Sequence, residues 1–415
     1  MPFPCYTFVM HIAIMTDLYL PMSGGTEISI DNQRRALEAA GHTVTIFTAA
    51  HPDVIHPEHI VVIPSVHFTT AQQETVRFSR PMATSFVVEQ LKKRHVDIVH
   101  VQTDFGVGIA GVYAARKLGL PLVYTLHTLL WKQVQTRNRS AKLAVHVFEK
   151  PMQWRLKPGK NFLLARIPGE PLYAYKTRRH SCLMASKADV VVSPSAHMAR
   201  KFREWLPNLH VVVSPNFITI APRQTPLPPV PTFLWMGRMM PEKRVLDLCK
   251  GVDLVHEYTT KPFHVVIVGN GYHLDDVTEW AADKPFVTLA GSVANNAVDD
   301  YIDHSSALVM TSHGFDNQPM VIAESIVGGR GIISVDPDLL LDIDPDAGAY
   351  PIDSSPEGLA QQLAELIDHP ETLQEMSDAA ARCAPTFSAD AGRRRIEAAY
   401  EEALRMHRPS STIEM

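Results

Sequence analysis

The chain has 415 residues, more than one hydrophobic core usually holds, so we expect two domains. Hydrophobic residues form 46% of the sequence and charged residues 20%, and the net charge is −5, a balance typical of a soluble globular protein. No apolar run approaches the ~18–20 residues of a membrane-spanning helix, and no signal peptide is expected. The scattered cysteines argue against disulfides or a zinc site, and they favour a reducing, cytoplasmic compartment.

Short apolar runs alternate with helical patterns through the first half of the chain. Strands are predicted at 11–16, 43–49, 60–64, 98–102, 122–126 and 190–193, and helices at 25–40, 81–94, 107–118 and 178–187. Gly41 and Gly119 stand where a helix is expected to end. Strands that alternate with helices form parallel βαβ units, so residues 1–220 are predicted to form one Rossmann-like domain.

One segment of this half is strongly basic. Residues 131–180 contain twelve Lys or Arg and two Glu, and Trp131, Trp154 and Tyr173 are among its aromatic residues. Cations mixed with aromatic rings suit the interface of an anionic membrane, but also a nucleic-acid surface or a solvated basic face. Of these three interpretations we favour the membrane, and we expect no nucleic-acid partner.

A proline-rich stretch, residues 221–231, is predicted to link two domains because prolines at that density prevent regular structure. The alternation then resumes, with strands at 232–236, 263–268, 287–290, 307–311 and 331–335 and helices at 243–256, 273–282, 297–303, 320–327 and 356–368. The second domain is therefore 232–389, and a last helix within 390–415 could rejoin the first. The predicted fold class is α/β, with two doubly wound Rossmann-like domains that face a central cleft.

Two cations follow the first strand of the second domain. Arg238 and Lys243 lie in Gly237-Arg238-Met239-Met240-Pro241-Glu242-Lys243, near a predicted helix N-terminus. Taken alone, Arg238 and Lys243 are either two ordinary cations on a solvated loop or a phosphate site. A planar guanidinium beside a compact ammonium suits vicinal phosphates, and a helix N-terminus adds to the attraction for an anion.

Two acids, Asp316 and Glu324, lie on either side of another predicted helix start. Glu324 falls in the apolar helix 320–327, where a carboxylate is costly unless hydrogen-bond donors such as ribose hydroxyls reach it. Asn317, Gln318 and the amides of Met320 and Val321 form the entry to that helix and could cap a phosphate. Together the cations and acids could hold a sugar nucleotide.

Several glycines and one histidine are further candidates. Gly24 and Gly25 begin the first helix, and Gly269 and Gly271 follow the strand at 263–268. Each pair either forms an ordinary turn or lets the backbone come close to a phosphate. Residues 106–111 match GxGxxG, but no acid follows about twenty residues later, so we interpret them as close helix–strand packing. His127 ends a predicted parallel strand, where it is either structural or faces a ligand.

These features together resemble a family-4 retaining glycosyltransferase of the GT-B fold, from about residue 10 to about residue 400. The resemblance rests on Gly237-Arg238-x4-Lys243, on the acids at 316 and 324, and on the segments 10–27, 97–100, 124–128 and 214–216. It implies an acceptor-binding first domain and a donor domain for a UDP- or GDP-sugar.

The resemblance also implies a role for each candidate. Arg238 and Lys243 would bind the diphosphate, Glu324 the ribose, and Asp316 the hydroxyls of the transferred sugar, with His127 near the reacting carbon. The remaining donor contacts would come from Gly24, Gly25, Gly269, Gly271, Asn317, Gln318, Met320 and Val321, and from Val293 near the base. No metal and no cofactor besides the nucleotide sugar are expected.

The chain departs from the family pattern at two places. Asp316 stands where Glu is usual, and Gly329-Arg330-Gly331 stands where Pro is frequent. Residues 64–65, 77–81 and 103–108 resemble the glycolipid branch, especially diacylglycerol glycosyltransferases, although the tyrosines that often follow His-Thr in that branch are missing after Thr128. The expected reaction is hexose transfer to a lipid at the cytoplasmic face of the cell membrane. The alternatives are a soluble saccharide or polyol acceptor and a non-catalytic subunit that binds nucleotide sugars.

Overall fold

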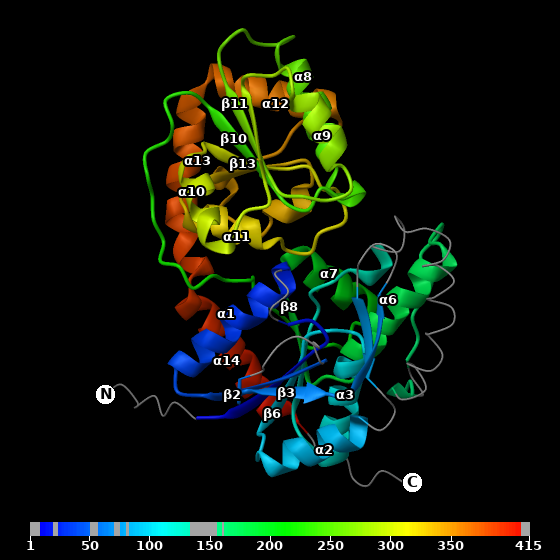
Figure 1. Cartoon of the computed structure of the whole chain (residues 1–415). Helices are drawn as coiled ribbons and strands as arrows, with labels where there is room; N and C mark the ends of the chain where they lie inside the picture. Colours follow the sequence, from blue (N-terminus) through cyan, green and yellow to red (C-terminus); the bar gives the residue numbers. More distant parts are fainter. Residues whose placement is uncertain are drawn as a thin grey trace. The chain divides into compact units, whose positions relative to one another are not determined.

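The computed structural model describes residues 9–19, 24–49, 57–69, 75–79, 83–132, 156–159 and 162–407. The chain forms two compact units, each built around a parallel sheet with helices packed on it (Figure 1). The first unit is Met1–Pro194, Met198–Ser214 and Arg393–Met415, and the second is Ser195–His197 and Pro215–Gly392.

The sheet of the first unit has seven strands in the order β3-β2-β1-β6-β7-β8-β9, all parallel. Their bounds are β1 (His11–Thr16), β2 (Thr43–Ala49), β3 (Ile60–Ile63), β6 (Ile98–Val101), β7 (Leu122–Thr125), β8 (Val190–Ser193) and β9 (Val211–Val213). The inner strands are buried almost throughout, as apolar runs in a sheet covered on both faces must be. The six strands predicted for this half are confirmed within two residues at each end.

Helices of the first unit connect these strands. They are α1 (Gly25–Ala39), α2 (Ala83–Lys93), α3 (Gly106–Leu118), α6 (Leu172–Ala185), α7 (Ala196–Trp205) and α14 (Ala389–Met406). Gly41 and Gly119 have φ angles of 95° and 64°, which explains the predicted helix stops, because only glycine adopts this conformation without strain. The predictions did not include α7, β9 or the antiparallel pair β4 (Ser65–Thr69) and β5 (Thr75–Ser79).

Helix α14 joins the first unit through side chains on its second half. The Tyr400 hydroxyl lies 2.9 Å from Nδ1 of His100 on β6, and Oε1 of Glu397 lies 3.1 Å from Nε2 of His42. The helix therefore begins in the second unit, and from Arg393 onwards it belongs to the first.

The sheet of the second unit has six parallel strands in the order β12-β11-β10-β13-β14-β15. Their bounds are β10 (Thr232–Met236), β11 (His264–Val268), β12 (Val287–Gly291), β13 (Ala307–Met310), β14 (Gly331–Ser334) and β15 (Gly348–Ala349). The helices are α8 (Val245–Val255), α9 (Leu274–Ala281), α10 (Val298–Asp303), α11 (Met320–Val327), α12 (Pro356–Asp368) and α13 (Pro370–Cys383), with α8 packed along α12 (Figure 1). Only β15 and α13 were not predicted here.

The division between the units lies at Ser214–Pro215, before the proline-rich stretch 221–231 rather than at it. The reason is a buried arginine. The Arg330 guanidinium donates hydrogen bonds to the carbonyls of Ser305 (2.7 Å), Asp303 (2.7 Å) and Thr225 (3.1 Å). These bonds hold the stretch against the second unit. Arg330 belongs to Gly329-Arg330-Gly331, one of the two places where the sequence departs from the family pattern.

Both sheets have a point at which the strand order reverses. In the second unit β10 lies between β11 and β13, so the loops that follow β10 and β13 leave the sheet on the two sides of this point. Ligands of open α/β sheets bind at this position, beyond the carboxyl ends of the strands. The cation motif follows β10 and the first acid follows β13, so the fold places both there.

Candidate functional site

The loop after β10 packs backbone against backbone with the loop after β11. The amide of Met239 donates to the Asn270 carbonyl (2.8 Å), and the amide of His273 donates to the Met239 carbonyl (2.9 Å). Gly269 and Gly271 have positive φ, and a Cβ on them would lie 1.9 Å from the Gly237 oxygen and 2.8 Å from the Met239 nitrogen. The glycines are therefore required by the contact between the two loops.

Lys243 and Asp316 form an ion pair at the reversal point of the second sheet. Lys243 Nζ lies 2.6 Å and 2.8 Å from the two carboxylate oxygens, and the Ser312 hydroxyl donates to one of them at 2.5 Å. The two side chains are 19% and 11% exposed. The fold thus joins two residues to which the sequence assigned separate partners, a phosphate for one and a sugar for the other.

The position of Lys243 is fixed from the core outwards. Its carbonyl accepts a hydrogen bond from the Thr311 hydroxyl (2.7 Å), and the Thr311 oxygen accepts one from the indole nitrogen of Trp235 (2.9 Å). Lys243 ends a 3-10 turn, Pro241–Lys243, and α8 begins only at Val245 after Arg244, which has a φ of 53°. The prediction that Lys243 starts the helix is wrong, because this left-handed residue separates the turn from the helix.

Arg238 is the exposed cation of the site. Its side chain has no hydrogen bond or ion pair within the described part of the chain. A guanidinium that is not held by the protein keeps its full set of donors for an anion, whereas Lys243 shares its charge with Asp316.

Glu324 is a half-buried carboxylate on α11. Among the described residues no side chain or amide donates a hydrogen bond to it. Burial, together with the nearby carboxylate of Asp299, raises the pKa of Glu324 to about 7. A ligand with hydroxyl donors would stabilise the charged form, which is the chemistry expected for a ribose contact.

The entry to α11 is held by segments from elsewhere in the second unit. The Ser195 hydroxyl donates to Asn317 Oδ1 at 2.5 Å, and Asn216 Nδ2 donates to the Gln318 carbonyl at 3.0 Å. The Asn317 side chain is thus engaged within the protein. The Gln318 side-chain oxygen accepts from the Asn216 amide, whereas the buried Gln318 Nε2 has no partner among the described residues. No described side chain caps the helix, so the amides of Met320 and Val321 remain available for a phosphate.

Val293 follows β12 at the edge of the same sheet, half-buried between exposed neighbours. Its expected contact with a base stays a prediction.

His127 is the candidate residue of the first unit, directly beyond β7. Its Nε2 lies 2.8 Å from Oε1 of Gln102, whose amide nitrogen in turn bonds to Gln33 Oε1. Because the amide nitrogen is used for Gln33, the Gln102 oxygen accepts a hydrogen bond from the N–H of His127 Nε2, which leaves Nδ1 as an acceptor. Burial lowers the pKa of His127 to about 4, so the ring is neutral at physiological pH.

Gly24 and Gly25 form the start of α1, with Gly24 as the N-cap. The carboxylate of Glu27, itself buried, lies against Gly24, and a Cβ there would come 2.5 Å from Oε2. An acidic side chain thus already lies at this helix end, and close approach of a donor phosphate stays a prediction.

The GxGxxG at residues 106–111 is packing, as predicted. A Cβ on Gly108 would lie 1.9 Å from the Thr103 carbonyl oxygen, and one on Gly111 would lie 2.6 Å from Met15 Cγ. The N-terminus of α3 is occupied by Asp17, which accepts hydrogen bonds from the amide of Val107 (2.8 Å) and the amide of Gly108 (3.3 Å). Burial nevertheless raises the pKa of Asp17 to about 6.

Sequence reasoning missed Gln102, Ser312 and Thr311, the residues that position His127, Asp316 and Lys243. Each is a polar residue within or directly after an apolar strand, and that placement is the signal that could have indicated them. In the described part of the chain, no three His, Cys, Asp or Glu side chains are grouped as metal ligands. Across the same ranges no helix has both the length and the apolarity to cross a bilayer.

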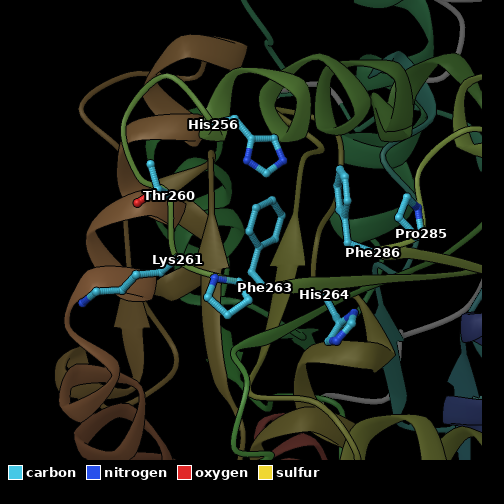
Figure 2. Close-up of a pocket in the computed structure, with 8 residues that line it drawn as sticks. His256, Thr260, Lys261, Phe263, His264, Pro285 and Phe286 are labelled. Carbon is cyan, nitrogen blue, oxygen red and sulfur yellow. The ribbon is translucent and has the colours of Figure 1, made fainter.

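A hollow lies in the second unit at the amino ends of β11 and β12. It has a volume of about 390 Å³, and the rings of His256, Phe263 and Phe286 line it (Figure 2). The rings lie 5.2–5.3 Å apart, centre to centre. Because it lies at the amino ends of the strands, this hollow is separate from the loops that carry Lys243 and Asp316.

Two family descriptions match the chain in succession, Glycosyltransferase Family 4 over residues 23–222 and Glycosyl transferases group 1 over residues 219–382. The chain belongs to glycosyltransferase family 4. The predicted family is therefore confirmed.

Curated relatives within this family match a limited stretch. An alpha-monoglucosyldiacylglycerol synthase from Streptococcus pneumoniae is 36% identical over 121 residues, which are 29% of this chain and 27% of that protein. A protein of the same name from Acholeplasma laidlawii is 31% identical over 119 residues, 29% of this chain and 30% of that protein. The match thus spans less than one third of either relative.

Solved structures share the whole fold. Sucrose-phosphate synthase from Thermosynechococcus elongatus has a TM-score of 0.66 at 15% identity and covers 95% of this chain and 99% of its own. Staphylococcus aureus TarM has a TM-score of 0.66 at 11% identity, covering 96% and 100%. Anabaena HepE, solved with UDP and glucose, has a TM-score of 0.64 at 14% identity, covering 94% and 99%. These likenesses confirm the predicted GT-B fold of two Rossmann-like domains.

Proposed function

We propose that the protein transfers a hexose from a nucleotide diphosphate sugar to a lipid acceptor such as diacylglycerol, with retention of the anomeric configuration. The observation that carries the lipid acceptor is the match to two alpha-monoglucosyldiacylglycerol synthases. Of the two nucleotides considered, UDP is favoured over GDP because several neighbours of the same fold were solved with UDP.

Charge stabilisation on the leaving group is the main catalytic contribution in this proposal. Departure of the nucleoside diphosphate leaves negative charge on phosphate and positive charge at the anomeric carbon. Arg238, Lys243 and the first amides of α11 would stabilise the phosphate charge from fixed positions, which is how preorganised sites lower barriers. The acceptor hydroxyl oxygen then attacks the anomeric carbon from the face that the diphosphate leaves, and its proton passes to an oxygen of the departing diphosphate. We propose no cofactor or metal ion beyond the sugar nucleotide.

Recognition of the donor would involve the two carboxylates. Glu324 would accept hydrogen bonds from the ribose hydroxyls, since it has no donor within the described protein. Asp316 would contact the hydroxyls of the transferred sugar next to its ion pair with Lys243. In the other unit, neutral His127 would accept a hydrogen bond from a sugar hydroxyl through Nδ1.

We place the protein at the cytoplasmic face of the membrane as a peripheral enzyme, docked through the basic segment 131–180. Residues 133–155 and 160–161 of that segment lie outside the described residues. If half of its cations face anionic lipid at about 1 kcal/mol each, about 6 kcal/mol results, enough for reversible docking.

The test is a product analysis with matched variants. The purified protein is incubated with a panel of UDP- and GDP-hexoses and a diacylglycerol dispersion, and the products are identified by mass. We expect one glycosylated lipid from the wild type and none from Arg238→Ala/Lys243→Ala. The control Lys250→Ala removes a cation that is 69% exposed on α8 and should leave transfer unchanged. Wild-type rates in the double variant would contradict the donor site.

The same experiment separates the alternatives. Glycosylation of saccharides or polyols, but of no lipid, would assign a soluble acceptor. Donor binding without transfer or hydrolysis would assign a nucleotide-sugar-binding subunit.

A further inference from the structure

Three large apolar side chains project from the irregular segment that leads into α6 and from the first residue of that helix. Leu163 is 83% exposed, Ile167 44% and Leu172 49%. Single exposed apolar residues are ordinary on protein surfaces, but several on one segment indicate a surface that contacts something else. We call residues 162–172 the apolar turn.

A buried ion pair holds the apolar turn in place. The Arg178 guanidinium, with its residue fully buried, donates to the two oxygens of Glu170 at 2.7 Å each and to the Ala165 carbonyl at 2.9 Å. Glu170 also accepts from the amide of Ile167 at 3.1 Å. A buried pair of this kind is rarely a net source of stability, whereas losing one partner is costly, so its effect is to specify one conformation of the turn.

Packing explains why the apolar side chains point outwards. Phe162 and Leu164 lie against the core of the first unit, and the Tyr175 hydroxyl donates to the Leu164 carbonyl at 3.2 Å. Leu163, between the two inward residues, is therefore directed to solvent. The turn cannot bury it by rotating, because Phe162 and Leu164 anchor both sides.

The charge around the apolar turn is positive. Residues 162–179 contain four Lys or Arg and one Glu, and that Glu is paired with the buried Arg178. Arg166 is exposed at the turn, and Tyr173 and Tyr175 are half-buried beside it. Exposed leucine and isoleucine with arginine and tyrosine around them match the headgroup region of an anionic bilayer, where apolar side chains enter and cations stay at the surface.

We propose that the apolar turn is a membrane anchor that inserts Leu163, Ile167 and Leu172 into the interface of an anionic lipid bilayer. The inference deepens the proposed lipid-acceptor function and rests on it for its biological purpose. It differs from docking by basic residues alone, because insertion of apolar side chains survives salt that screens the charges.

Vesicle co-sedimentation of the full chain tests the anchor. The variant is Leu163→Ser/Ile167→Ser/Leu172→Ser, and the vesicles are phosphatidylcholine with phosphatidylglycerol. The matched control is Leu341→Ser/Ile352→Ser, which removes side chains that are 50% and 82% exposed in the second unit. At about 0.5 M salt, where the Debye length is only a few Å, we expect the triple variant to bind about tenfold or more weakly than wild type and the control to bind equally.

A second readout reports insertion directly. Tryptophan fluorescence of Leu163→Trp should shift to the blue when these vesicles are added, and that of Ile352→Trp should not. All the substituted positions are exposed, so melting temperatures should stay close to wild type, which excludes misfolding as the cause.

Three results would overturn the anchor: no binding of the wild type to the vesicles, equal binding of the triple variant at high salt, or a changed oligomeric state of the triple variant. The last would assign the turn to a protein interface. Failure of the proposed function looks different, since it would be absence of lipid glycosylation by a wild type that binds vesicles normally.

Discussion

Replacement of Asp316 by asparagine should make UDP bind more tightly while making sugar transfer slower. In the folded chain the Asp316 carboxylate neutralises Lys243 at 2.6 Å. A diphosphate that contacts the same ammonium would lie roughly 5 Å from that carboxylate, where two unit charges repel by ~3 kcal/mol at an effective dielectric constant of about 20. Screening by salt and water reduces this to ~1–2 kcal/mol, or about tenfold in affinity.

Titration calorimetry with UDP measures the first effect, and the initial rate of transfer measures the second. Transfer should fall because the carboxylate that contacts the sugar hydroxyls is lost. The control is Asp283→Asn, which makes the same change in net charge at a side chain that is 83% exposed. If the Asp316 variant, folded normally, bound UDP no more tightly than wild type, then Lys243 does not contact the donor diphosphate.

Three further predictions follow from single residues. Burial raises the pKa of Glu324 to about 7, so the folded chain holds the carboxyl proton more tightly than the unfolded chain does. Ionisation of Glu324 therefore destabilises the fold, and this destabilisation is absent below about pH 4.5 and complete above about pH 7. Glu324→Gln should therefore raise the free energy of unfolding by up to ~3 kcal/mol at pH 8 but not at pH 4.5. Donor binding by the wild type should strengthen from pH 6 to pH 8. Equal stabilisation by Glu324→Gln at both pH values would contradict this prediction. Gly108→Ala should lower stability by ~1–3 kcal/mol in denaturant titration because its Cβ meets the Thr103 carbonyl, whereas Gly159→Ala, with open space around it, should be neutral. Arg238→Ala should leave the melting temperature unchanged and weaken UDP binding at least about tenfold, since the side chain is exposed and has no partner in the described protein; a large loss of stability would refute that interpretation.

The predicted fold agrees with the structure where the pattern of apolar residues is strong. The strand His11–Thr16 and the helix Met320–Val327 were predicted at their observed bounds, because buried parallel strands and apolar helices leave an unambiguous local signal. Helix α7 has a short apolar stripe, Met198, Ala199 and Phe202, with charged residues inside the stripe and directly after it. This pattern indicates a helix only once the core that receives the stripe is known.

For the candidate site, too, the sequence indicates the residues but not their long-range contacts. Arg238, Lys243 and Asp316 were predicted as candidates from residue type and position after apolar strands, and Glu324 from its position within an apolar helix. Their pairing was not, because the contact between Lys243 and Asp316 joins loops from different strands, and chain spacing carries no information about it.

The amino-acid sequence alone thus determines the local structure. It shows the alternation of apolar strands and helices, the glycines that end helices, and the cations and acids near strand ends. Long-range contacts come only from folding. They include the Lys243–Asp316 pair, the neutral ring of His127 against Gln102, and the buried Arg178–Glu170 pair beneath the apolar turn. The physical reason is that burial and pairing change the charge and hydrogen bonding of a side chain, and both depend on neighbours that lie far away along the chain.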